Sequence, residues 1–427
     1  MNRPIYTLIA RLLLPAALLR LLWRSLRQPG YRRRWRERLG HDAHPPAPGG
    51  VWVHAVSVGE VQAALPLLQW LLSHEPHWEI TVTTTTPTGA QRVVELLGDR
   101  VHHRYTPFDL PGIVARVLDQ RRPRLLVIFE TELWPNLLDA CRCRNIPLVL
   151  ANGRLSERSL KGYQRLQPLV AETLAAFTWV TAQSNRDATR FLALGADPAR
   201  VVVTGNIKFD ATVPHDLAIQ ASALRLKWGD QRPVWIGAST HEGEETLLLQ
   251  AHRQLLQVFP DALMILAPRH PERFSKVAGL IENAGFPFAR RSREGVAEPR
   301  HPVFLLDRLG ELLLAYAASD VACVGGSWVP VGGHNLLEPA SLGVPVLFGP
   351  HTGNFVEIAA LLEEAGGGVR VQTADQLVER LRTWFANPLE RTRVGHNGQR
   401  AVAANRGALE RLVGLLKNSL LTKPAGQ

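Results

Sequence analysis

Cysteine is scarce in this sequence, with three residues, Cys141, Cys143 and Cys323, among 427. Three thiols cannot build a disulfide framework, and Cys141 and Cys143 have no second pair at the spacing of a structural metal site. The chain also lacks a Walker-type lysine motif, and neither His-x-x-x-His nor Asp-x-Asp follows a predicted strand. We therefore expect a protein of a reducing, cytoplasmic compartment that uses no metal and no cofactor.

Acidic residues are nearly absent from the first 39 positions. Residues 1–39 hold ten arginines and one glutamate, Glu37, so this segment carries +9 of the formal net charge of +11. A nucleic-acid-binding fold normally spreads positive charge and aromatic side chains over the surface that reads the nucleic acid. Because the charge here is confined to one terminal segment, we expect no nucleic acid partner.

The same segment holds a long apolar stretch. Residues 5–23 are mostly Leu, Ile and Ala, but Arg11, Pro15 and Arg20 interrupt them. A membrane-spanning helix needs about 20 apolar residues, and an arginine near its centre costs several kcal/mol. The arginines of residues 32–38 attract anionic headgroups and favour the cytoplasmic side. We expect residues 1–39 to anchor the chain at an anionic membrane surface; the alternative is a basic helix packed on its own domain.

A removable signal peptide is not expected, because no small-residue cleavage site follows the apolar stretch.

Apolar runs typical of buried strands alternate with helical patterns through the rest of the chain. This alternation predicts parallel sheets with both faces covered by helices. The expected strands lie at residues 51–55, 80–84, 124–129, 147–150, 179–183 and 201–204, and then at 234–237, 262–267, 303–306, 321–324, 344–348 and 368–371.

The length of the chain exceeds one ordinary hydrophobic core and fits two α/β domains. We place the first Rossmann-like domain at residues 50–210, a linker at 211–231 and the second domain at 232–400. Helical patterns at 374–385 and 401–421 close the chain, with a helix and tail at 401–427. Two parallel sheets that face a central cleft would bind ligands at the carboxyl ends of their strands.

The glycine-rich stretch at residues 325–340 is the strongest candidate for ligand binding. It reads as a strand-to-helix turn, with a helix expected to begin near His334. Glycines such as Gly326 and Gly333 let the backbone approach a ligand and point N–H groups at a phosphate. Asn335 lies in the same turn, and Glu338, one turn into the helix, suits a sugar hydroxyl. The alternative is a structural turn with a solvated glutamate.

Residues 54–60 follow the first expected strand. Ser57 suits a helix N-cap, and Glu60 lies three residues later, where a capping box places a carboxylate. Glu60 equally suits a general base. Both interpretations remain open from the sequence.

Two acids, Glu130 and Glu132, directly follow the strand expected at 124–129 and precede Trp134 and Pro135. They are candidates for binding hydroxyl groups or for catalysis. The alternative is that they stabilise the N-terminus of the next helix.

Basic residues follow several other strands and predict an anionic ligand. Lys208 ends the first domain, and Arg269 and His270 follow the second strand of the second domain. Ser239 follows the first strand of that domain in a stretch that we interpret as an anion cradle. The alternatives are solvated side chains and an ordinary N-cap formed by Ser239 or Thr240.

Five motifs in order, at residues 54–60, 130–136, 205–210, 267–273 and 325–340, resemble the 3-deoxy-D-manno-octulosonic acid (Kdo) transferase family, glycosyltransferases of the α/β GT-B fold. The resemblance covers nearly the whole chain. It implies an inverting enzyme at the cytoplasmic face of the bacterial inner membrane that moves Kdo from CMP-Kdo to a lipid A precursor, lipid IVA, in lipopolysaccharide synthesis.

Within this resemblance Glu60 corresponds to the catalytic base, and Glu132, beside Glu130, to an essential acid. Together with the basic and glycine-rich stretches above, it gives a set of expected donor-binding residues: Lys208, Ser239, Arg269, His270, Gly326, Gly333, His334, Asn335 and Glu338. Two alternatives remain, namely a GT-B transferase or epimerase that acts on a UDP-sugar, and a non-enzymatic binding protein driven by the arginine segment.

Overall fold

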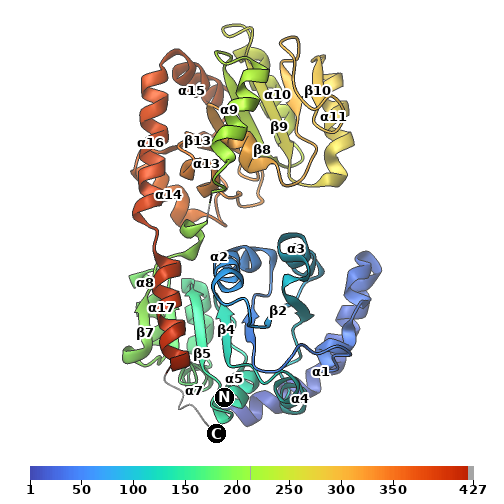
Figure 1. Cartoon of the computed structure of the whole chain (residues 1–427), viewed down its shortest axis with the longest axis vertical. Helices are drawn as coiled ribbons and strands as arrows, with labels where there is room; N and C mark the ends of the chain where they lie inside the picture. Colours follow the sequence, from blue (N-terminus) through green and yellow to red (C-terminus); the bar gives the residue numbers. More distant parts are fainter. Residues whose placement is uncertain (212, 422–427) are drawn as a thin grey trace. The chain divides into compact units, whose positions relative to one another are not determined.

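The computed structural model describes residues 1–211 and 213–421, which divide into two compact units. The first unit contains residues 1–211 and 406–421, and the second contains residues 213–405. Each unit is an α/β structure built around a parallel sheet (Figure 1). The predicted fold class is therefore confirmed for each unit by itself.

Within the described part of the first unit the sheet has seven strands in the order β3-β2-β1-β4-β5-β6-β7. All neighbouring strands pair in parallel. The strands are β1 (Val51–His54), β2 (Ile80–Thr84), β3 (His102–Tyr105), β4 (Leu125–Phe129), β5 (Leu148–Gly153), β6 (Trp179–Ala182) and β7 (Val201–Val203).

The described part of the second unit repeats this design with the order β10-β11-β9-β8-β12-β13-β14, again all parallel. The strands are β8 (Val234–Thr240), β9 (Leu263–Pro268), β10 (Phe288–Arg290), β11 (Val303–Leu305), β12 (Val321–Val324), β13 (Val346–Phe348) and β14 (Gly368–Arg370).

Helices cover both faces of the first sheet. Val53 on one face of β1 belongs to a core cluster that includes Leu67 and Leu412, whereas Trp52 on the opposite face packs in a cluster with Leu118 and Leu138. The helices of this unit are α1 (Arg3–Arg27), η1 (Pro29–Arg32), η2 (Trp35–Leu39), α2 (Val58–His74), α3 (Pro87–Leu97), η3 (Gly98–Arg100), α4 (Pro111–Arg121), α5 (Pro135–Cys143), α6 (Glu157–Gln164), α7 (Gln167–Leu174), α8 (Asn185–Ala193), η4 (Pro198–Arg200), η5 (Ile207–Asp210) and α17 (Ala408–Leu421).

The second sheet packs one face on a cluster that joins Trp235 and Met264 to Leu248, Ile281 and Leu381. The helices of this unit are α9 (Leu217–Trp228), α10 (Glu244–Leu255), η6 (Pro271–Arg273), α11 (Phe274–Asn283), α12 (Leu312–Ala317), α13 (Leu337–Ser341), α14 (Val356–Glu364), α15 (Ala374–Ala386) and α16 (Pro388–Ala404).

In each sheet the order in which successive strands are added changes from one side of the first strand to the other. From β1 the chain builds β2 and β3 on one side and then continues with β4 on the other, so that β1 pairs with both β2 and β4. The second unit does the same around β8, which pairs with β9 and β12. Open α/β sheets bind ligands at the carboxyl ends of the strands at such a point.

Three features differ from the sequence-based expectation. The region expected to be a linker contains α9, whose Trp228 is fully buried. The helix expected over residues 401–421 is interrupted, because α16 ends at Ala404 and Gly407 has φ +95° before α17 begins. The strands β3 and β10 were not predicted.

Candidate active site

Glu60 lies in the first turn of α2, at the carboxyl end of β1. Ser57 is the N-cap, as predicted, and its side chain accepts from the Glu60 N–H at 3.4 Å. The Glu60 carboxylate accepts from the Val56 N–H at 2.9 Å and from the Ser57 hydroxyl at 3.0 Å. Glu60 is only 8% exposed, and burial raises its pKa to about 8, with Glu130 and Glu132 adding to the rise. Glu60 therefore supports the helix start and also exchanges its proton near neutral pH.

Glu130 and Glu132 follow β4, the strand beside β1. Glu130 has φ +59°, a conformation that non-glycine residues rarely adopt, and its carboxylate pairs with Lys208 of η5 at 3.2 Å. Burial, with a smaller contribution from the charge of Glu130, raises the pKa of Glu132 to about 7. Strained backbone of this kind is concentrated at functional sites.

The structure thus brings Glu60, Glu130, Glu132 and Lys208 together in the first unit. Burial first, and then the neighbouring carboxylates, raise the pKa values of Glu60 and Glu132, so these two groups hold protons at pH values where an isolated glutamate has lost its own. Such a cluster can remove a proton from a hydroxyl group or return one. Lys208, which ends the first domain and is expected to help bind the donor, pairs here with Glu130 of this cluster.

His54, the last residue of β1, is fully buried below this cluster. Its Nδ1 lies 2.8 Å from the Thr83 hydroxyl, and its ring meets the Trp134 ring edge to face at 6.1 Å. Burial lowers the pKa of His54 to about 3, so the ring is neutral at physiological pH.

The glycine-rich turn of the second unit is organised by Glu244, a residue that no sequence motif marks. Glu244 is 1% exposed, and its carboxylate accepts from the N–H groups of Gly326 at 2.8 Å, Ser327 at 3.1 Å and Trp328 at 2.9 Å. It also accepts from the His241 N–H at 2.8 Å. The turn does gather amide donors as predicted, but they bind an internal carboxylate.

The N–H groups of Gly326 and Gly333, which the sequence interpretation aims at a ligand, both have partners inside the protein. The Gly326 N–H points at Glu244, and the Gly333 N–H donates to the Gly326 carbonyl at 2.7 Å, so neither faces a ligand. Both glycines are nevertheless required by geometry, because Gly326 has φ +67° and Gly333 has φ +80°. A Cβ on Gly326 would lie 2.8 Å from the His334 ring.

Three histidines gather beside the turn. The His241 and His334 rings stack at 5.0 Å with their Nε2 atoms 2.8 Å apart, and the His270 ring meets His241 edge to face at 5.3 Å. Burial, with a smaller contribution from the positive charge of Arg269, lowers the pKa of His334 to about 3. His334, His270 and Arg269 were predicted for this site; His241 was missed, although it lies in the stretch interpreted as an anion cradle.

The alternative interpretation of Ser239 as an N-cap is wrong, and the helix expected near His334 begins three residues later. Ser239 is not an N-cap, because β8 continues to Thr240 and α10 begins at Glu244 with Gly243 as its cap. The helix expected near His334 is α13, which has five residues and begins at Leu337.

Asn335 and Glu338 do lie together at the start of α13. The Asn335 side chain accepts from the Leu337 N–H at 3.1 Å and donates to Glu338 at 3.0 Å.

The two sheets place the chain among proteins with the GT-B architecture. The fold is similar to that of a UDP-GlcNAc 2-epimerase from Neisseria meningitidis, with a TM-score of 0.59 and 17% identity over 86% of this chain and all of the other. It is also similar to a putative UDP-N-acetylglucosamine 2-epimerase from Listeria monocytogenes, with a TM-score of 0.56 and 18% identity over 88% of this chain and 98% of the other. At such identities the likeness shows the fold alone.

Sequence comparison defines the family. The sequence is 43% identical to a 3-deoxy-D-manno-octulosonic acid transferase of Haemophilus influenzae over 92% of this chain and 93% of the relative, and 37% identical to one of Bordetella pertussis over 98% and 100%. The family profile for 3-deoxy-D-manno-octulosonic-acid transferase (kdotransferase) matches residues 33–211. The chain belongs to the Kdo transferase family and is a glycosyltransferase.

Proposed function

We propose that this glycosyltransferase moves Kdo from CMP-Kdo to a lipid A precursor, lipid IVA, with inversion at the anomeric carbon, and that Glu60 is the general base. The observation that carries the proposal is the buried Glu60 carboxylate at the carboxyl end of β1, with a pKa raised to about 8 by burial. A general base works best when its pKa lies near the operating pH. The names of the relatives supply the sugar that is transferred.

In the proposed step, ionised Glu60 removes the proton from a hydroxyl of the acceptor sugar. The acceptor oxygen forms a bond to the anomeric carbon of Kdo while the bond from that carbon to the phosphate oxygen breaks, and CMP leaves with the bonding electron pair. Glu132, which retains a proton near neutral pH, is suited to hydrogen-bond an acceptor hydroxyl. Lys208 adds a positive charge to the acidic cluster through its pair with Glu130.

We assign donor binding to side chains of the second unit. Because Glu244 occupies the amides of the glycine-rich turn, the anionic groups of the donor are bound by the exposed cation Arg269 together with His270 and the half-buried Ser239. Gly326 and Gly333 shape the turn that holds His334. The pair formed by Asn335 and Glu338 is suited to the ribose hydroxyls.

We further propose that α1 lies in the plane of the cytoplasmic face of the inner membrane. The helix is long and apolar enough to cross a membrane by length and composition. It exposes large apolar side chains to solvent, including Leu12 at 72%, Leu19 at 66% and Trp23 at 60%. The exposed arginines of η1 and η2 supply the charge that attracts anionic lipids.

Contacts at the first turns of α1 favour the in-plane orientation over a spanning one. Thr7 donates to the Asn136 side chain at 2.8 Å, and Arg3 pairs with Asp139 at 2.6 Å, both on α5. The opposite end continues into η1 and η2, which also belong to the first unit. A helix with both ends fixed to one unit keeps both ends on one side of a bilayer.

Product analysis tests the proposed reaction. Purified enzyme with CMP-Kdo and lipid IVA should yield, by mass spectrometry, an acceptor that has gained Kdo, whereas Glu60→Gln should lower turnover about 100-fold or more because the base is lost. The control is Gln91→Ala, on the exposed surface of α3. Wild-type turnover in Glu60→Gln would contradict the assignment of the base, and transfer from a UDP-sugar without transfer from CMP-Kdo would contradict the donor.

A further inference from the structure

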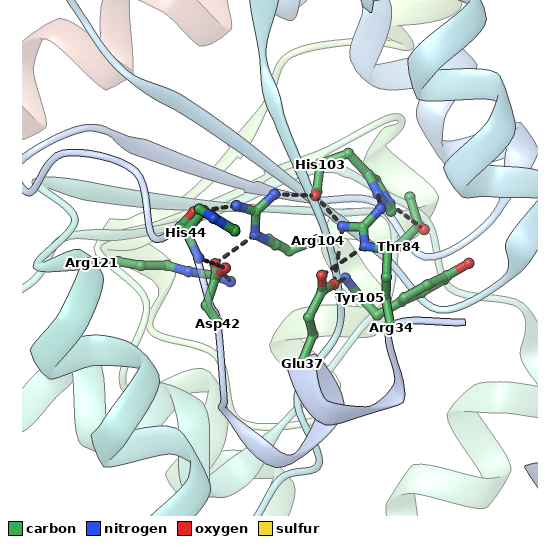
Figure 2. Close-up of polar contacts among 9 residues, drawn as sticks. All are labelled: Arg34, Glu37, Asp42, His44, Thr84, His103, Arg104, Tyr105 and Arg121. Carbon is green, nitrogen blue, oxygen red and sulfur yellow. Dashed lines mark hydrogen bonds and ion pairs between the residues drawn. The ribbon is translucent and has the colours of Figure 1, made fainter. Parts of the chain in front are cut away.

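The segment that follows α1 is built into the edge of the first sheet. Figure 2 shows the side chains of Arg34, Glu37 and Asp42 gathered on β3. Arg34 donates to the His103 carbonyl and pairs with Glu37 at 2.7 Å, and Glu37 in turn accepts from the Tyr105 N–H at 2.9 Å. The membrane-binding part of the chain therefore continues, without an intervening free linker, into the structure that carries the acidic cluster.

Arg38, between these contacts, is buried without a carboxylate partner. It is 4% exposed, its guanidinium lies 4.4 Å from the centre of the Tyr105 ring, and its Nη2 donates to the Thr85 carbonyl at 2.7 Å. Arg38 forms no ion pair within the described ranges 1–211 and 213–421, although the charge of Glu37 favours its charged form from a greater distance. Burying an unpaired cation costs stability, and such costs are commonly retained where they serve function.

Three consecutive hydrogen bonds join Arg38 to the carboxylate of Glu60. Arg38 holds the Thr85 carbonyl, the Thr85 N–H donates to the Val56 carbonyl at 3.0 Å, and the Val56 N–H donates to Glu60 at 2.9 Å. Thr85 and Val56 lie beyond the paired residues of β1 and β2, whose register ends at His54. Arg38 therefore restrains Thr85, whose hydroxyl also donates to Thr106, and Thr85 in turn restrains Val56.

The same segment also reaches the loop that carries Glu132. The Arg38 carbonyl accepts from the Phe108 N–H at 2.8 Å, and the neighbouring Asp109 carboxylate accepts from the N–H groups of Asn136 at 3.0 Å and Leu137 at 2.7 Å. These are first-turn amides of α5, which begins three residues after Glu132. Arg38 thus contacts, through its side chain, the backbone that leads to Glu60 and, through its carbonyl, the segment that binds the start of α5 after Glu132.

We propose that Arg38 is a positioning residue for Glu60, by which the membrane-binding segment holds the catalytic carboxylate in place. The inference rests on the proposed role of Glu60 as the base. It assigns to the basic segment a second task besides binding lipid, since one of its arginines faces inward while Arg33 and Arg36 are exposed.

The test compares Arg38→Met and Arg38→Lys with the wild-type enzyme in the full chain, using the same detergent-dispersed acceptor. Arg38→Met should lower kcat about 10-fold to 100-fold with little change in the KM for CMP-Kdo, because the base is displaced while donor binding is untouched. The rising limb of kcat against pH should move to higher pH, because the Val56 hydrogen bond that lowers the pKa of Glu60 weakens. Arg38→Lys, which keeps a cation and a donor, should recover part of the loss.

Arg92→Met is the matched control, since Arg92 forms a partly exposed pair with Glu95 on α3. The proposal would be overturned if kcat fell only in proportion to the unfolded fraction of the variant and the pH at which kcat rises stayed the same. Wild-type kinetics in Arg38→Met would also overturn it. If Arg38→Met does not fold, the same two measurements on Arg38→Lys decide. Glu60→Gln separates the two claims: if it is inactive and the Arg38 variants are normal, only the positioning role fails, whereas an active Glu60→Gln removes the base assignment and the positioning role together.

Discussion

At the scale of single residues, Glu60 and Glu244 occupy related places in the two units and act in opposite ways. Each lies in the first turn of the helix after the first strand of its sheet, and each accepts backbone N–H groups. Glu60 accepts one such N–H and keeps a pKa near neutrality because of burial. Glu244 accepts four, which binds it permanently into the glycine-rich turn.

The first prediction concerns the pH dependence of turnover. Because Glu60 must be ionised to accept a proton and its pKa is raised to about 8, kcat should rise with pH through about 8. The measurement is kcat from pH 6 to pH 9.5 with saturating substrates. If the residual kcat of Glu60→Gln rises with pH as in the wild type, the titration belongs to another group.

The same titration predicts a pH effect on stability. The folded-state pKa of Glu60 is raised from its ordinary 4.5 to about 8, so its protonated form stabilises the fold fully below about pH 4.5, and this contribution is lost as pH rises through about 8. Thermal denaturation of wild type and Glu60→Gln across this range should show the wild-type Tm falling relative to that of the variant. A constant difference in Tm would contradict the raised pKa.

The third prediction tests the structural task of Glu244. Glu244→Gln keeps the shape but replaces one acceptor oxygen by an amide that opposes backbone donors, so it should destabilise the second unit by about 3 kcal/mol or more. The measurement is urea denaturation. Glu242→Gln, two residues earlier on the exposed surface, is the control and should change little. Equal stability of the two variants would show that the turn does not depend on Glu244.

At the scale of elements, α1 combines an exposed apolar surface with fixed attachment to α5. Leu12 and Leu19 of α1 are largely exposed, and Trp35 of η2 is exposed at 48%. The element is part of the first unit's structure, and its exposed apolar side chains support the proposal that it binds lipid.

A double substitution on that surface gives the fourth prediction. Leu12→Asp with Leu19→Asp should release the full-length protein from vesicles that contain phosphatidylglycerol, since each aspartate costs on the order of 1 kcal/mol or more in apolar contact and opposes the anionic surface. Co-sedimentation with the vesicles measures this. Leu389→Asp, at a residue that is 85% exposed on α16, is the matched control. Unchanged sedimentation of the double variant would contradict the lipid-facing role of α1.

At the scale of the whole molecule, proton transfer and donor binding are assigned to different units. The acidic cluster belongs entirely to the first unit, and the histidine cluster with Arg269 belongs to the second. Nucleotide binding can therefore be measured without turnover.

The fifth prediction follows from this division. CMP at about 100 times its Kd should stabilise the protein by about 2.7 kcal/mol, whereas UDP at the same concentration should have a much smaller effect. A thermal shift assay compares the two nucleotides, and Arg269→Ala should abolish most of the CMP effect while Arg92→Ala leaves it unchanged. Stronger protection by UDP would favour a UDP-sugar enzyme.

Much of the fold followed from the sequence because buried parallel strands are continuous apolar runs, which are visible without any tertiary information. The sequence pattern does not reveal the two edge strands β3 and β10, because neither is a continuous apolar run. In β3 the residues are His-His-Arg-Tyr, with alternate positions half-buried, and β10 has three residues. The helix α9 was missed because it has no marked apolar face, although Trp228 at its end is buried.

The acidic residues and the basic segment were determined by the sequence alone, since their types and their places after strands are local facts. What only the tertiary structure decided was which groups satisfy one another. Lys208 joins Glu130 across 78 positions, and Glu244 fills the amides of a turn more than 80 positions away. Hydrogen bonds between distant segments depend on how strands are ordered in the sheet, and that order is set by packing that no local pattern records.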